Sequence, residues 1–163
     1  MMNKVLFAAL ALVMLLLASC GTGNRLARAE REARIASQVE AALDARQYTI
    51  AVDWMRPLGG MPRHVNSDYE LKVNGDEMDS YLPYVGEAYR LPYGGGKGLN
   101  FKAAIYNYTL IPSGDKCYLI EFDVENEEDV FHYRINVFTN GKAIIDVWAR
   151  DRDSISFQGE LVF

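Results

Sequence analysis

The chain has 163 residues, a formal net charge of −5, and ten Tyr and seven Phe among them. This length corresponds to one domain of ordinary size that can bury a hydrophobic core. The acidic balance excludes nucleic acid as a favoured partner, because phosphate binding requires a basic face.

The first 19 residues have the pattern of a bacterial secretion signal. Lys4 supplies a positive charge, and an uninterrupted apolar run extends from Val5 to Leu17. The run is too short for a membrane-spanning helix, which needs ~20 apolar residues, so we interpret residues 1–19 as a signal peptide. The small residues before Cys20 resemble a bacterial lipobox. That resemblance implies a lipoprotein with acyl chains such as palmitate on Cys20; the alternative is an ordinary signal peptide that ends near a cysteine.

The residues after Cys20 bear on location. No Asp lies close behind Gly21, and Asp near that position resembles an inner-membrane retention signal. The segment Gly21–Arg25 also lacks the acidic run that resembles the surface-display signal of Bacteroidetes lipoproteins. We therefore expect a protein anchored to the outer membrane through Cys20 and facing the periplasm, where two or more acyl chains give stable anchoring.

A helix is expected from about Arg25 to Arg46, with Asn24 as its N-cap. In its second half Ile35, Val39 and Leu43 follow the helical period and form one apolar stripe.

The first half of the expected helix has no apolar stripe and is rich in arginine. We interpret residues 20–34 as a lipid anchor and stalk, and residues 35–163 as a single domain.

After Gln47 the hydrophobic period changes to two. Tyr48, Ile50, Val52 and Trp54 alternate with Thr49, Ala51 and Asp53. Further strand-like runs follow at about 69–73, 78–82, 102–111, 117–125, 130–138, 142–150 and 154–161. One helix followed by such runs predicts an α+β fold, with the N-terminal helix packed on a mostly antiparallel, meandering sheet of about seven strands.

A three-residue loop, Thr139–Gly141, is expected between two of these strands. It pairs Ile135 with Ile145 and Tyr133 with Val147 on the core side, and Gly141 then occupies the left-handed position of a bulge. A two-residue turn would instead place Asp146 opposite Ile135, on the apolar face.

The sequence supports no familiar catalytic or cofactor site. His64 and His132 are far apart, and neither has a partner at metal-ligand spacing, so no metal or other cofactor is expected. The glycine run around Lys97 lacks the Ser or Thr that a phosphate-binding loop requires. Glu121 and Asp123 alternate with apolar residues, which indicates the solvated face of a strand.

The most distinctive segment is Ser80–Tyr89, which continues through a glycine-rich run to Phe101. Together with Ile155–Gly159, it resembles a family of Bacteroidetes lipoproteins classed as a domain of unknown function, number 4251 of that series. The resemblance covers most of residues 47–161. It implies a secreted or lipid-anchored location and a small α+β domain, without an assigned activity.

Aromatic rings with hydroxyl tips suit a surface that binds sugars or peptides. The candidate ligand-binding residues are therefore those of the loop and its end: Tyr81, Tyr84, Tyr89, Tyr93, Asn100 and Phe101. Alternatively, the tyrosines only pin a long loop onto the sheet.

We expect a non-catalytic, periplasm-facing binding module that uses loop 81–101 and takes a glycan, a peptide or an envelope protein as its partner. Two alternatives stay open: a small envelope enzyme with an unfamiliar site in the same loop, and a purely structural envelope protein. A titratable pair in a pocket would favour the enzyme, whereas an exposed aromatic patch would favour binding.

Overall fold

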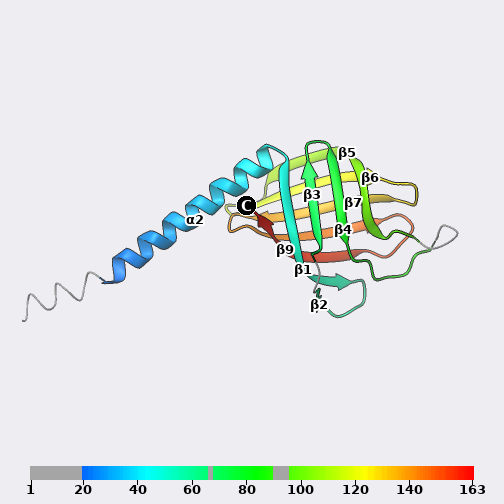
Figure 1. Ribbon diagram of the computed structural model, residues 1–163, viewed down its shortest axis with the longest axis horizontal. Coiled ribbons are helices and arrows are strands. Elements are labelled where there is room, and N and C mark those ends of the chain that lie inside the picture. Colours follow the sequence, from blue (N-terminus) through cyan, green and yellow to red (C-terminus); the bar gives the residue numbers. More distant parts are fainter. Residues whose placement is uncertain (1–19, 66–67, 90–95) are drawn as a thin grey trace, which may run out of the picture. The chain divides into compact units, whose positions relative to one another are not determined.

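The computed structural model describes residues 20–65, 68–89 and 96–163, with side chains from residue 25 onward (Figure 1). The expected signal peptide, the side chain of Cys20 and Tyr93 lie outside the described residues. The chain divides into two compact units between Ile35 and Ala36. None of the helices in the described residues has the length and apolar character needed to cross a membrane.

Helix α2 extends from Cys20 to Asp44, so Asn24 lies inside the helix and the predicted N-cap is wrong. Residues 25–34 are exposed, as expected for a charged segment without an apolar stripe. Val39 and Leu43 are buried, whereas Ile35 is only half-buried. The helix ends where Arg46 adopts a left-handed φ of 49°.

Nine strands follow the helix in the part of the chain that the structure describes. Their bounds are β1 (Gln47–Pro57), β2 (Arg63–His64), β3 (Glu70–Asn74), β4 (Glu77–Leu82), β5 (Leu99–Pro112), β6 (Cys117–Glu125), β7 (Val130–Phe138), β8 (Lys142–Ala149) and β9 (Ile155–Val162). Each strand pairs antiparallel with its neighbours.

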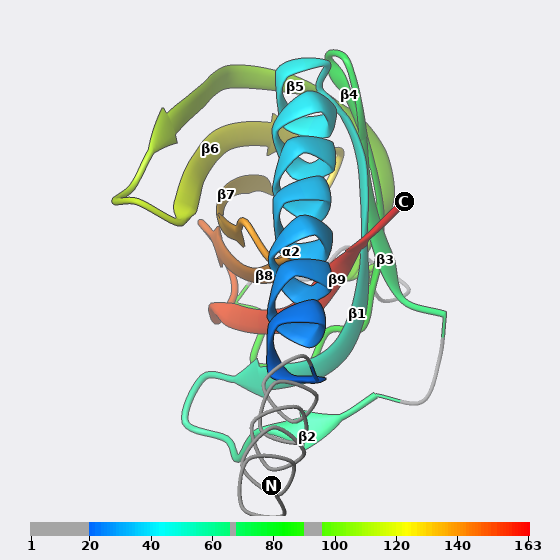
Figure 2. The ribbon, with the colours of Figure 1, turned by 90° about the vertical axis from the view of Figure 1, so that its left-hand side faces the viewer.

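The strands form a closed barrel rather than the open sheet of about seven strands that the sequence predicted. Strand β1 pairs with β3 on one side and with β9 on the other, which closes a ring of eight strands, and β2 adds to β1 as a ninth. Figure 2 shows these strands arranged around a central axis. The hydrophobic pattern reports which face of a strand is buried, but it contains no signal for the pairing of the first strand with the last.

Side chains fill the barrel interior, as expected for eight strands. Phe122, Phe131, Tyr133 and Phe157 are among the largest fully buried residues. The rings of Phe122 and Tyr133 stack with their centroids 5.2 Å apart, a geometry that adds ~0.5–1.5 kcal/mol to the burial of apolar area. The barrel interior is therefore a hydrophobic core.

The β7–β8 hairpin has the predicted register. Ile135 lies opposite Ile145, and Tyr133 lies opposite Val147. Gly141 has a φ of 87°, and its amide donates a hydrogen bond to the carbonyl oxygen of Phe138. Burial of the apolar face thus selects the three-residue loop.

Candidate functional site

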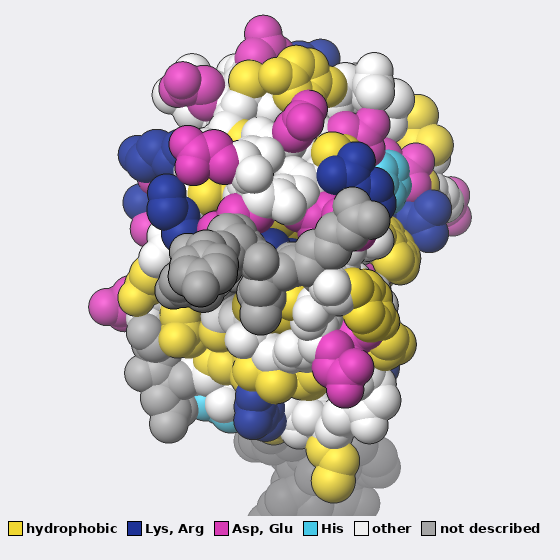
Figure 3. Space-filling view, turned by 90° about the vertical axis from the view of Figure 1, so that its right-hand side faces the viewer, with side chains coloured by type: hydrophobic (Ala, Val, Ile, Leu, Met, Phe, Trp, Pro, Cys, Tyr) yellow, Lys and Arg dark blue, Asp and Glu magenta, His cyan; other side chains and the backbone are white. Residues whose placement is uncertain are grey.

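The tyrosine-rich segment lies in the connection between β4 and β5, at the end of the barrel that Figure 3 shows. Acidic and basic side chains are interspersed over this end. The segment is attached to the β8–β9 connection by an isolated bridge between Ala88 and Arg152 and by a hydrogen bond from the Tyr89 amide to the Asp151 carbonyl oxygen.

Tyr84 and Tyr89 both contact Asp153. The Tyr84 hydroxyl lies 3.0 Å from the carbonyl oxygen of Glu87 and 3.1 Å from that of Asp153. The Tyr89 hydroxyl donates to the Asp153 carboxylate at 2.6 Å, and the Glu87 amide donates to the same carboxylate at 3.0 Å. These two bonds hold the pKa of Asp153 below its ordinary value. Both tyrosine hydroxyls thus have partners within the chain.

A buried ion cluster supports this end of the barrel. Arg152, 5% exposed, donates to Asp129 at 3.3 Å and to Glu128 at 3.1 Å. The Asp129 carboxylate also accepts the backbone amides of Val130, Arg150 and Asp151. Since a buried charge is costly unless paired and hydrogen-bonded, this cluster fixes the loops around it.

The other loop candidates lie on β4 and β5. Tyr81 is 43% exposed and packs against Tyr69, with ring centroids 5.3 Å apart. Asn100 lies opposite Tyr81 in the strand register. Asn100 and Phe101 line a cavity of about 240 Å³ together with Lys97, Lys102, Asn126, Glu127 and Glu128. The predicted residues thus form two groups, one around Asp153 and one beside this cavity.

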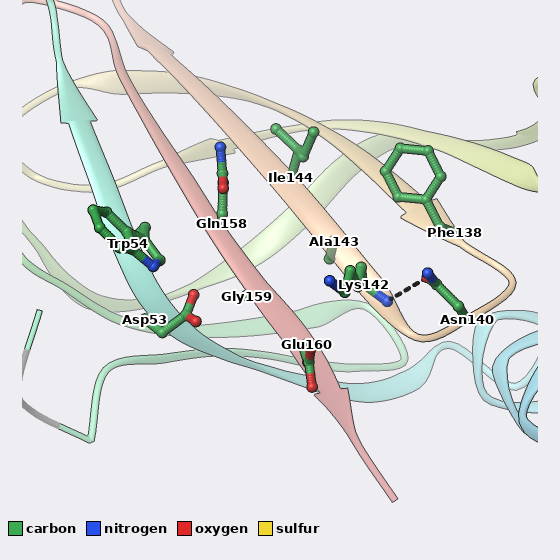
Figure 4. Close-up of a pocket in the computed structure, with 10 residues that line it drawn as sticks. All are labelled: Asp53, Trp54, Phe138, Asn140, Lys142, Ala143, Ile144, Gln158, Gly159 and Glu160. Carbon is green, nitrogen blue, oxygen red and sulfur yellow. Dashed lines mark hydrogen bonds between the residues drawn. The ribbon is translucent and has the colours of Figure 1, made fainter. Parts of the chain in front are cut away.

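A larger groove lies on the outer wall of the barrel, across β1, β8 and β9 (Figure 4). Its volume is about 440 Å³. An adjoining hollow of about 150 Å³ shares Trp54, Ile144 and Gln158 with it and adds Met55, Arg56, Pro62, Asp146 and Ser156. We call these two hollows together the Trp54 groove. The residues of the larger one are Asp53, Trp54, Phe138, Asn140, Lys142, Ala143, Ile144, Gln158, Gly159 and Glu160.

A β-bulge in β1 places Trp54 in this groove. The pairing of β1 with β9 is regular up to Val52 opposite Gly159 and then shifts, so that Trp54 lies opposite Gln158. Asp53 is the extra residue, and both Asp53 and Trp54 are exposed while Val52 and Met55 are buried. The sequence prediction that Trp54 shares the face of Val52 is therefore wrong, because one inserted residue reverses the side of every residue after it.

Gly159 makes the bulge possible. A Cβ atom at this position would lie 2.0 Å from the Ala51 carbonyl oxygen and 3.0 Å from the Val52 Cα. Both are backbone atoms of β1, so no side-chain movement could relieve the clash. The close approach of β9 to β1 requires glycine here.

Three of the polar side chains around Trp54 have no partner among the described residues, whereas Ser156 is bonded to Asp146 and Asn140 accepts the Lys142 amide. Within the described residues, the side chains of Asp53, Gln158 and Glu160 make no hydrogen bond or ion pair with any part of the chain. The Lys142 amine is also without an ion pair in that part of the structure. Figure 4 shows these side chains around the groove. Trp54 itself meets the ring of His64 edge to face, with centroids 5.6 Å apart, which restricts its orientation.

The outer wall beside the groove has the opposite character, because its polar groups are paired. The Asp123 carboxylate lies 2.8 Å from His132 Nδ1 and accepts the Asn107 amide at 2.8 Å. The bond from Asn107, then that from His132, lowers the pKa of Asp123. Arg134 donates to Glu121 at 2.7 Å. The Glu121–Asp123 row thus lies on the outer face, as predicted.

The wall does not assemble a familiar catalytic site. His132 contacts Asp123, and the Ser156 hydroxyl donates to Asp146, so these two residues use different carboxylates and do not form a nucleophile–base pair. The described residues contain no group of three or more His, Cys, Asp or Glu side chains that could hold a metal ion. Cys117 is half-buried in β6, and burial raises its pKa, which disfavours the reactive thiolate.

The Trp54 groove was not predicted from the sequence, although two signals for it are present there. The apolar residues of β1 occur at 48, 50 and 52 and then at 55 and 57, so the period slips by one residue. Gly159 is a single glycine inside a strand, and such a glycine often marks a bulge or a close backbone approach.

These observations define the class of protein: a small antiparallel β-barrel with a packed interior and a ligand-sized groove on its outer wall. The family described as domain of unknown function DUF4251 matches residues 30–161, and the chain belongs to that family. The search of curated proteins gave no match.

A solved structure has a similar fold. It is the crystal structure of a DUF4251 family protein from Bacteroides eggerthii DSM 20697, with a TM-score of 0.60 and 13% sequence identity. The alignment covers 78% of this chain and 87% of that one. At this identity the likeness concerns the fold alone.

Proposed function

We propose that this protein is a non-catalytic binding module of the cell envelope and that its ligand occupies the Trp54 groove. The observation that carries the proposal is the combination of an exposed tryptophan with unpaired Asp53, Gln158 and Glu160 side chains, in the described part of the chain, around a hollow of about 440 Å³. Ligand sites are typically concave and combine apolar or aromatic surface with a few polar groups that fix orientation.

The cost of building the groove supports a functional role. A bulge interrupts the β1–β9 pairing at the seam that closes the barrel, and it turns a large aromatic ring from the core side to solvent. Bulges of this kind occur next to functional sites, where they re-aim a side chain.

Footprinting with hydroxyl radicals tests the proposal and does not require the ligand to be identified. The full chain is oxidised in intact cells and, separately, after purification in detergent, and the oxidation of each aromatic residue is measured by mass spectrometry. We expect Trp54 to be oxidised several-fold more slowly in the intact envelope. Tyr81 is the matched control, because it is exposed to nearly the same extent (43% against 42%) and should react equally in both samples.

Equal oxidation of Trp54 in the two samples would show that the groove is empty in the envelope and would contradict the proposal. Protection of Tyr81 and Tyr89, with Trp54 unprotected, would move the binding site to the loop.

One observation favours a binding site at the loop instead, namely the cavity of about 240 Å³ that Asn100 and Phe101 line. Its hydrogen-bonding side chains could hold a polar ligand beside the loop that was predicted to bind. Tyr84 and Tyr89 add little to such a site, since their hydroxyls already have partners. The Trp54 groove is therefore the better-supported site.

We further propose that acylation of Cys20 anchors the protein to the outer membrane, facing the periplasm. The support is the signal-like segment before Cys20 and the absence of an acidic run after it. Mass spectrometry of the mature N-terminus should find an acylated cysteine, and Cys20→Ser should release the protein into the soluble periplasm. An unmodified N-terminus at another residue would contradict the anchor.

A further inference from the structure

We propose that the ligand of the Trp54 groove is a neutral oligosaccharide, and that its chain extends along the outer wall from Trp54 to Trp148. This inference rests on the proposed function, since it names the ligand class of the same groove. It also adds a second contact, on β8, that lies outside the groove.

Both tryptophans of the chain lie on the outside of the barrel. Trp54 is 42% exposed and Trp148 is 39% exposed, whereas the fully buried rings of the core belong to Phe and Tyr. Trp is normally well buried because of its large apolar area. An exposed indole ring offers a flat apolar face to the C–H face of a sugar ring, and its N–H can donate to a hydroxyl.

The two rings are held by their neighbours. Trp54 meets His64 edge to face, while the Arg134 guanidinium lies over the Trp148 ring, with its Cζ 5.3 Å from the centroid. The His132 ring lies on the same residue, 5.8 Å between centroids. Rings that are oriented before binding lose little conformational entropy when a ligand stacks on them.

The distance between the rings requires an extended ligand. Trp54 on β1 lies opposite Gln158 on β9, and Gln158 lies opposite Ile144 on β8. Trp148 lies on the same face of β8 as Ile144, four residues further along the strand. Four residues along a strand and two strand spacings separate the Cα atoms by about 16 Å. A short oligosaccharide covers this span and a single sugar does not. Asp146 and Ser156 lie between the two rings in the strand register, and their side chains are hydrogen-bonded to each other.

The charges of the groove favour a neutral ligand. The Trp54 groove holds three carboxylates (Asp53, Asp146 and Glu160) and two cations (Arg56 and Lys142), so an acidic chain and a basic chain would each meet like charges along it. Asp53, Gln158 and Glu160 are free to accept hydrogen bonds from hydroxyl groups within the described structure, and carboxylates and amides accept such bonds well. A ligand rich in hydroxyl groups and without charge satisfies all of these side chains.

A peptide fits the groove less well. Peptides commonly bind to β-proteins by adding a strand to an open sheet edge. In the groove, β9 is paired with β8 on one side and with β1 on the other, so it has no open edge to offer. Recognition must come from side chains alone, as in the binding of a sugar chain to a sheet face.

Titration calorimetry of the full chain in detergent tests the inference. The probes are cellohexaose, maltohexaose, mannohexaose and xylohexaose, with the corresponding disaccharides, an oligogalacturonate and hexalysine. We expect at least one neutral hexasaccharide to bind more tightly than its disaccharide and than either charged probe. Trp54→Ala should weaken hexasaccharide binding ~10-fold or more, as for an aromatic residue at the centre of an interface, whereas Trp54→Phe should retain most of the affinity.

Trp148→Ala separates the extended ligand from a local one. It should weaken hexasaccharide binding and leave disaccharide binding unchanged. Tyr81→Ala, an equally exposed aromatic residue on β4, should alter neither.

Binding of hexalysine or oligogalacturonate in preference to every neutral chain would overturn the inference, as would the absence of binding by any neutral chain. In both cases the proposed function stands or falls separately, on the protection of Trp54 in the envelope. Equal loss of both ligands in Trp148→Ala would contradict the extended path.

Discussion

At the loop end of the barrel, Asp153, Asp129 and Arg152 are bound by neighbouring groups, whereas in the Trp54 groove Asp53, Gln158 and Glu160 have no partner in the described part of the chain. Both regions combine aromatic rings with carboxylates, and the sequence predicted a binding site in the first because its tyrosines are more conspicuous. Polar groups already satisfied by the chain stabilise the fold, while unsatisfied exposed groups are available to a ligand. Residue type alone therefore does not locate a binding site.

The largest expected effect concerns Arg152. Arg152→Met removes the cation that neutralises Asp129 and Glu128, whose side chains are 0% and 9% exposed. Removing one partner of a buried pair typically costs ~3–5 kcal/mol, and urea unfolding should show a loss of that order. The control is Arg150→Met, because the Arg150 side chain is 67% exposed and its loss should change stability by no more than ~0.5 kcal/mol. Equal losses of stability in the two variants would mean that the buried ion cluster stabilises the loop end no more than an exposed charge does.

The next effect concerns the groove. Gly159→Ala places a methyl group against the Ala51 backbone and should cost ~1–3 kcal/mol by overpacking. It should also change the accessibility of Trp54, which indole fluorescence quenching measures. Gly60→Ala is the matched control, since its Cβ would meet only the Pro57 side chain, at 3.3 Å. Unchanged stability and quenching in Gly159→Ala would show that the bulge does not depend on glycine.

Trp54 should contribute much less to the free energy of unfolding than a fully buried aromatic residue of the core. Trp54→Ala should lower the free energy of unfolding by at most ~1–2 kcal/mol, because 42% of the residue is already exposed. Phe131→Ala should cost ~3–5 kcal/mol, since Phe131 is fully buried. Comparable losses in urea unfolding would mean that Trp54 is a structural residue, and the groove would lose its main argument.

The sequence predicted local features well and closure poorly. The alternation of apolar residues located the long strands, and the conflict between Asp146 and Ile135 was enough to select the correct hairpin register. Closure of the barrel depends on the pairing of β1 with β9. These two strands are far apart in the sequence and share no local pattern. The groove was missed for the same reason: its residues come from three strands, and the bulge that exposes Trp54 shows only as a one-residue slip.

The smallest expected effect is a pKa change at the loop end. The Tyr89 hydroxyl and the Glu87 amide both donate to the Asp153 carboxylate and hold its pKa below the ordinary 3.8. The bonds favour the charged form, so their stabilisation is present above pH 3.8 and is lost as the pH falls through the lowered pKa. Tyr89→Phe removes one bond, so the pKa of Asp153 should rise towards 3.8 without reaching it, because the Glu87 amide remains. NMR titration of the side-chain carboxyl carbon measures this shift, and Tyr81→Phe should leave it unchanged. An unchanged pKa of Asp153 in Tyr89→Phe would mean that the Tyr89 hydroxyl is free in solution. That hydroxyl would then be available to a ligand, as the unpaired side chains of the Trp54 groove are.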